Sequence, residues 1–173
     1  MPATGTAMAP APIPSAPVDH ALLEQKVKLQ ARMRSGAGWF MAVALFSVIN
    51  SALVFFDAKL HFIVGLGVTQ IADGVGKVGG AAGSVAGFVV SVVAAGVFTL
   101  FWKFSREGKE WAFLTGMILY GFDGLIFLAV GAWLDLAFHA FALFSIYKGL
   151  TALYALKKLD AQSALPSAQS IIR

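Results

Sequence analysis

Two residues of opposite charge, Asp123 and Lys148, lie inside long apolar stretches of the sequence. A charge in the hydrocarbon core of a bilayer costs about 2.5 kcal/mol or more unless it is paired or hydrated. We therefore predict that both side chains face protein or a cavity, as partners of each other. The favoured interpretation is an ion pair that fixes the register of two helices; the alternatives are a proton or ion relay, and a Lys148 that extends alone to the surface.

The depth of the two residues agrees with such a pair. If the turn between the last two apolar stretches lies near Trp133, Asp123 comes ten residues before it and Lys148 fifteen after it. Their depths then differ by about 7 Å at the helical rise of about 1.5 Å per residue, and a lysine side chain covers most of that distance. The predicted intramembrane polar cluster comprises Asp123, Lys148, Asn50, Tyr120 and Tyr147.

A second set of candidate residues is a repeated pair of aspartate and histidine. Asp57 and His61, and likewise Asp135 and His139, are four residues apart, which places each pair on one face of a helix. Imidazole and carboxylate together suit a divalent metal such as zinc, copper or iron, provided that the two pairs converge. The favoured alternative is that each aspartate caps a helix and binds its own histidine, and then no cofactor is expected.

Signatures of enzymes are missing from the sequence. It contains no Gly-x-Ser-x-Gly elbow, no His-Glu-x-x-His motif and no complete phosphate loop. It also contains no cysteine, which excludes disulfides, thiol catalysis and thiolate-bound metal. We therefore expect a protein that is not an enzyme.

The elements that must position these residues are membrane-spanning helices. Hydrophobic residues make up 58% of the 173 residues and charged residues 13%. Apolar runs close to the ~20 residues needed to cross a bilayer predict spans at about 39–56, 85–102, 111–133 and 134–156. The expected fold is an all-α integral membrane protein, a four-transmembrane-helix bundle with an additional outer interfacial or re-entrant helix at about 60–78.

The segment 60–78 has apolar residues every three or four positions, which indicates an amphipathic helix. A crossing there would make a fifth span and would move the basic loop 103–109 to the outer side. The four-span arrangement is favoured because it keeps the basic clusters on one side. The glycine-rich stretch 79–83 is read as a flexible linker to the next span.

Outside the bundle, which is assigned to residues 36–158, three segments are distinguished. The Ala/Pro-rich tail 1–17 is predicted to be disordered. Residues 18–35 form a basic amphipathic helix with Asp19 as its N-cap, and this helix is expected to end at Ser35–Gly36. Residues 159–173 form a C-terminal tail.

The basic residues predict the orientation of the chain. They cluster before the first span, between the second and third, and after the fourth, which is the cytoplasmic side by the positive-inside rule. Both termini are therefore expected to be cytoplasmic, in the inner membrane of a bacterium. The net charge of +4 is assigned to topology and to the lipid bilayer, and no nucleic-acid partner is expected.

Small residues recur one helical turn apart at the start of the second span. Such a row lets two helix backbones approach closely, either inside the bundle or in a homodimer. The row consists of Gly83, Gly87, Ser91 and Ala95. Two functions remain open: a non-catalytic structural or accessory component of a homo-oligomer or larger membrane complex, or a transporter or channel for a small solute, a proton or a metal ion.

Overall fold

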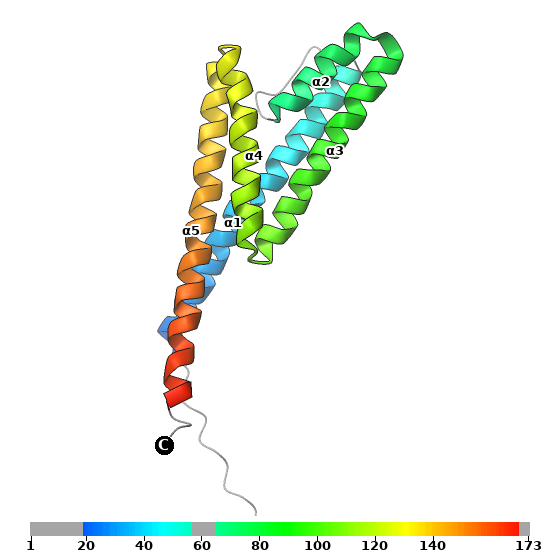
Figure 1. The fold of residues 1–173 in the computed structure, drawn as a ribbon. Helices are drawn as coiled ribbons and strands as arrows, with labels where there is room; N and C mark the ends of the chain where they lie inside the picture. The colour runs from blue at the N-terminus through cyan, green and yellow to red at the C-terminus, as the bar shows by residue number, and fades with distance from the viewer. Residues whose placement is uncertain (1–18, 57–64, 170–173) are drawn as a thin grey trace, which may run out of the picture.

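The computed structural model describes residues 19–56 and 65–169, the last five of them by backbone alone. This part of the chain forms α-helices joined by short connections (Figure 1). Four of the helices are long and apolar enough to cross a membrane. They are α1 (His20–Phe55), α3 (Gly80–Arg106), α4 (Glu110–Ala129) and α5 (Trp133–Gln169). The protein is therefore an all-α, multi-pass membrane bundle.

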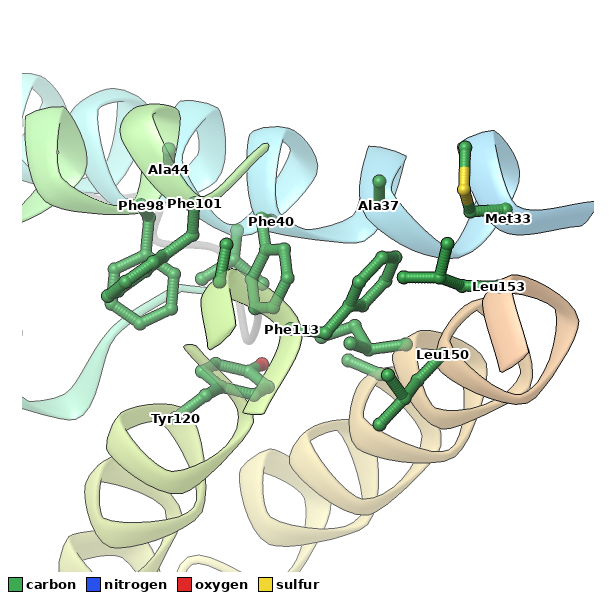
Figure 2. Close-up of a cluster of buried hydrophobic side chains, with 14 of the residues drawn as sticks. Met33, Ala37, Phe40, Ala44, Phe98, Phe101, Phe113, Tyr120, Leu150 and Leu153 are labelled. Atoms are coloured by element: carbon green, nitrogen blue, oxygen red, sulfur yellow. The ribbon is translucent and has the colours of Figure 1, made fainter. Parts of the chain in front are cut away.

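Helix α1 packs along both α3 and α5, and α4 joins α5 in a tight hairpin (Figure 1). The core between these helices is dominated by phenylalanine. Phe40 of α1 is fully buried, with its ring centroid 6.2 Å from Phe98, 5.9 Å from Phe101 and 6.2 Å from Phe113 (Figure 2). Lipid chains are as apolar as these side chains, so the packing of rings and small residues, rather than exclusion of water, holds the helices together.

Helix α1 is one continuous helix of 36 residues, so the expected break at Ser35–Gly36 does not occur. Asp19 does cap its first turn, since its Oδ1 accepts a hydrogen bond of 3.1 Å from the Leu22 N–H. Gly36 is buried against Gly149 of α5: a Cβ on Gly36 would lie 2.5 Å from the Gly149 Cα. Gly36 is therefore not a helix end but a point of close contact between α1 and α5.

The additional short helix is α2 (Gly67–Val78), and residues 60–64 of the segment predicted for it lie outside the described residues. Val68, Ile71 and Val75, members of its apolar stripe, are exposed on the outer surface. Thr69 and Asp73 instead point into the bundle and are buried. This distribution suits a helix that is immersed in lipid and packed on protein.

The start of α2 lies deep in the bundle. Leu66 and Val68 line one cavity together with Ala94 and Phe98, which lie about half way along α3, and with Asp123 of α4. From there α2 runs outward beside α3 to the far end of the bundle (Figure 1). Helix α2 is therefore a re-entrant half-helix, with its amino end at membrane depth.

The turn between α2 and α3 is a single residue, Gly79, so the predicted flexible linker at 79–83 is instead mostly helix. Gly80 begins α3 with a φ of +68°, a conformation that side chains disfavour. The span is accordingly longer than the predicted range 85–102.

The first turns of α1 and the last turns of α5 lie side by side at one end of the molecule (Figure 1). Lys26 of α1 forms an ion pair of 2.6 Å with Asp160 of α5, and Lys157 forms one of 2.6 Å with Glu110 at the start of α4. The three basic clusters therefore meet at the same end of the bundle, as a four-span chain requires.

Candidate functional site

The Asp123 carboxylate, which is 7% exposed, holds the amino end of α2. Its Oδ2 accepts a hydrogen bond of 2.7 Å from the Gly67 N–H, and its Oδ1 accepts one of 2.9 Å from the Val68 N–H. The first N–H groups of a helix have no partner within the helix and carry partial positive charge. The N-cap residue of α2, Leu66, makes no side-chain capping bond, and Asp123 supplies that bond from a helix that is distant in sequence.

Two other backbone groups of the entry turn, residues 65–68, are also paired. The Leu66 N–H donates to Ser47 Oγ of α1 at 2.8 Å, and the Thr69 hydroxyl donates to the Leu66 carbonyl at 2.7 Å. Irregular backbone at membrane depth is tolerated only where protein or a water-filled cavity satisfies it. Gly67 has no side chain because a Cβ there would lie 2.9 Å from the ring of Phe127.

His139 of α5 is the ionisable partner of Asp123. Its Nε2 lies 2.9 Å from Asp123 Oδ2, and its Nδ1 lies 3.0 Å from the backbone carbonyl oxygen of Asp135. A carbonyl oxygen only accepts, so Nδ1 carries a proton and donates it. One further proton lies between Nε2 and Oδ2. Whichever of the two atoms holds it, the pair of side chains has no net charge, which favours its burial at membrane depth.

The imidazole ring of His139 is held between two aromatic rings of α4. The Tyr120 ring stacks on it at a centroid distance of 4.3 Å and an angle of 18°, and the Phe127 ring lies 4.9 Å from it. Tyr120 is fully buried, and its hydroxyl has no hydrogen-bond partner among the described residues. The site therefore presents a carboxylate, an imidazole and a phenol on adjoining turns.

The predicted pair of Asp123 and Lys148 does not form. Lys148 is an exposed side chain, and its ammonium group lies 4.8 Å from the centroid of the Phe144 ring. The turn of the hairpin is centred on Gly131, whose φ is +70°, rather than near Trp133. Asp123 lies eight residues before Gly131 and His139 eight after it, so these two share one depth. Lys148 lies nine residues beyond His139, or about 13 Å along the helix.

Of the other members of the predicted polar cluster, Tyr120 is part of the site through His139, whereas Tyr147 is 51% exposed. Asn50 of α1 is buried and belongs to the entry turn: a Cβ on Gly65 would lie 3.1 Å from its Nδ2. The structure thus brings three of the five predicted residues to the entry of α2.

A second buried carboxylate, Asp73 of α2, was not singled out from the sequence. Its Oδ2 accepts a hydrogen bond of 2.5 Å from the Ser51 hydroxyl of α1, and its Oδ1 accepts one of 3.4 Å from the Ser91 hydroxyl of α3. The signal for it was the position of Asp73 on the α2 face opposite the apolar stripe. Asp73 joins α2 to α1 and α3, and Asp123 joins α2 to α4 and α5.

The row of small residues on α3 is occupied within the same chain by α2. Gly83 packs against the Gly76 carbonyl, and a Cβ on Gly87 would lie 2.7 Å from the Ala72 carbonyl oxygen. Ser91 and Ala95, the other two members of the row, are both buried. This arrangement matches the interpretation of the row as a packing seam inside one bundle.

Of the predicted metal ligands, Asp57 and His61 lie outside the described residues. Asp135 lies in the first turn of α5, where its carboxylate complements the helix dipole. The two ring nitrogens of His139 contact the Asp135 backbone carbonyl and the Asp123 carboxylate. Within the described ranges, no three His, Asp or Glu side chains are grouped closely enough to hold a metal ion.

This arrangement defines a class of protein: a multi-pass helical membrane protein whose buried ionisable groups hold a re-entrant helix in place. No protein-family model, curated protein or solved structure matches this chain. The assignment of function therefore rests on the chemistry of the site.

Proposed function

We propose that this protein is a non-catalytic structural or accessory component of a membrane complex, in the inner membrane of a bacterium. The observation that carries the proposal is that the hydrogen bonds of the Asp123 carboxylate are made within the protein. Both of its oxygens accept hydrogen bonds from the protein, two from α2 and one shared with His139. A carboxylate that is committed in this way positions a helix and leaves little capacity to bind a polar substrate.

Asp73 supports the same proposal. Its carboxylate is 5% exposed and is paired with two serine hydroxyls from neighbouring helices. The buried polar groups thus hold α2 against its neighbours, and the apolar outer surfaces of α2 and α3 are left toward the membrane.

The experiment that tests this proposal is sizing of the native protein after gentle solubilisation. We expect a defined assembly larger than the 18.2 kDa chain, with one partner or further copies at fixed stoichiometry by native mass spectrometry. Cross-linking in intact membranes before solubilisation is the control for association in detergent. A monomer that carries only lipid, in both experiments, contradicts the proposal.

A second candidate function is proton handling, and the pair of Asp123 and His139 favours it. The two groups share one proton at membrane depth, and the Tyr120 ring stacks on the imidazole. Reconstitution into liposomes that contain a pH-sensitive dye separates the candidates. Proton flux above that of protein-free liposomes, lost in His139→Gln with the fold intact, would favour the relay, whereas a structural component gives no such flux.

The proposed orientation has both termini in the cytoplasm. It is supported by nine of the 13 Lys and Arg residues, which lie on the segments that meet at one end of the bundle. They are Lys26, Lys28, Arg32, Arg34, Lys103, Arg106, Lys109, Lys157 and Lys158.

Reporter fusions test this orientation. We expect a fusion after Gly108 to report the cytoplasm and a fusion after Gly80 to report the opposite side, because these positions lie at the two ends of α3. Alkaline phosphatase and a fluorescent protein that matures only in the cytoplasm give complementary signals. The same compartment for both positions would contradict a spanning α3, and reversed signals would contradict the orientation.

A further inference from the structure

A surface pocket of about 380 Å³ lies between α1 and α5, away from the Asp123 site. Arg32 and Lys148 contribute two cationic side chains to its lining, and Ser35 contributes a hydroxyl group. Ser145 also lines the pocket, but its hydroxyl donates to the Phe141 carbonyl at 2.9 Å. Trp39 forms an apolar part of the wall. Cationic and hydroxyl groups around one space are the donors that bind a phosphate.

The two cations have no carboxylate partner within ion-pair distance in the described part of the chain. Lys148 precedes Gly149, which packs against Gly36 inside the bundle, so Lys148 lies within the packed part of α5. The exposed ammonium group of Lys148 faces the surroundings of the membrane helices. An ammonium group that has only the face of the Phe144 ring as a partner costs free energy in that position unless an anion or water reaches it. An anion that is itself part of the membrane meets this need.

The pocket continues into an aromatic surface. The ring centroid of Trp39 lies 6.1 Å from that of Phe138 and 5.2 Å from that of Phe141, and Phe141 is 54% exposed. Tryptophan is typical of the boundary between headgroups and acyl chains. A ligand that combines a phosphate with a hydrocarbon chain matches both halves of this surface, whereas free phosphate matches only one.

We propose that this pocket binds an anionic phospholipid, with its phosphate between Arg32 and Lys148 and an acyl chain along Trp39 and Phe141. Two cations that line one pocket disfavour the positively charged headgroup of a zwitterionic lipid. The site is therefore selective for lipids with net negative charge. This inference does not depend on the proposed function, since it concerns a different surface and different residues.

Native mass spectrometry of the full chain in detergent tests the proposal. The probes are phosphatidylglycerol and phosphatidylcholine with identical acyl chains, added singly. We expect tighter binding of phosphatidylglycerol, and a reduction of about fivefold in its affinity for each of Lys148→Gln and Arg32→Gln, from about 1 kcal/mol for each cation near an anionic lipid. Binding of phosphatidylcholine should be unchanged.

Arg34→Gln is the matched control. Arg34 is exposed on the same helix, two residues after Arg32, and its loss changes the net charge by the same amount outside the pocket. Circular dichroism and thermal unfolding verify that every variant folds. A variant that fails to fold is replaced by the conservative Arg32→Lys or Lys148→Arg, which should retain the lipid.

Four results would overturn the proposal. The first is equal affinity for the two lipids, and the second is an equal loss of phosphatidylglycerol in Arg34→Gln. The third is displacement of the lipid by millimolar inorganic phosphate, which would indicate a site for the free anion. The fourth is a change of oligomeric state in Lys148→Gln with lipid binding intact, which would indicate contact with a second copy.

Discussion

Replacement of Asp123 by alanine should release the amino end of α2 from the bundle. Three groups lose their hydrogen-bond partner at once: the Gly67 N–H, the Val68 N–H and His139 Nε2. Each buried polar group left without a partner costs about 1–3 kcal/mol, so we expect a loss of at least about 3 kcal/mol in the free energy that holds α2 in place. Asp123→Asn keeps one acceptor oxygen and should lose less.

Thiol labelling measures this release, because the chain has no cysteine of its own. Thr69 lies on α2 and is fully buried, so a Thr69→Cys substitution reports access to the inner face of the helix. We expect a small maleimide to react with it at least 100-fold faster in the Asp123→Ala background, which corresponds to about 3 kcal/mol.

Asp135→Ala is the matched control for that measurement. It also removes a carboxylate, but Asp135 is partly exposed, and only its backbone carbonyl contacts His139. Labelling in this variant should stay at the parent rate. If Asp123→Ala leaves labelling slow while the protein stays folded, Asp123 does not hold α2.

The surroundings of Asp123 could be predicted from the sequence only in part. Runs of apolar residues predicted the four spans and the bundle, because a bilayer sets the length of such runs. The need of Asp123 for a partner was also predicted, but the partner was not. A turn placed two residues too late shifts the matching position on the returning helix by about four residues, more than one helical turn. Lys148 was then the nearest residue of opposite charge on the returning helix. His139 was not considered as the partner, because a sequence does not show whether a histidine is neutral or shares a proton with a carboxylate.

The entry turn at 65–68 was beyond sequence reasoning for a different reason. The N–H groups of Leu66, Gly67 and Val68 are satisfied by Ser47 and Asp123, from helices before and after the turn in the chain. A local pattern shows that 60–78 is amphipathic, but it does not show which face meets protein. The apolar stripe of α2 faces outward because apolar side chains are stable in lipid, as they are not in water. Asp73 is buried because lipid, which cannot hydrogen-bond, does not solvate a carboxylate.

Glycine carries the same ambiguity. Gly36 after Ser35 has the composition of a helix end, and a helix end is what the sequence predicted. Its reason for being glycine is Gly149, which is 113 positions away in the chain. Only the packing of α1 on α5 separates the two interpretations, so a substitution at this crossing tests the interhelical contact directly.

Gly36→Val should destabilise the bundle strongly, while Gly38→Val should not. A Cβ on Gly36 lies 2.5 Å from the Gly149 Cα, and no rotamer change relieves a clash with backbone, so α1 and α5 must separate. A Cβ on Gly38 has nothing within 4 Å, and both substitutions place the same residue in the middle of α1, so helix propensity cancels. We expect a difference of about 3 kcal/mol in the free energy of unfolding, the upper part of the range for overpacking.

Unfolding in mixed micelles of detergent and dodecyl sulfate, followed by circular dichroism, measures this difference. Gly149→Val provides an independent check from the other helix, since a Cβ there lies 2.8 Å from the Gly36 Cα. The double variant should lose less than the sum of the two single variants, because helices already separated by one side chain have room for the second. Additive losses, or equal losses at positions 36 and 38, would mean that close contact between these glycines does not hold α1 to α5.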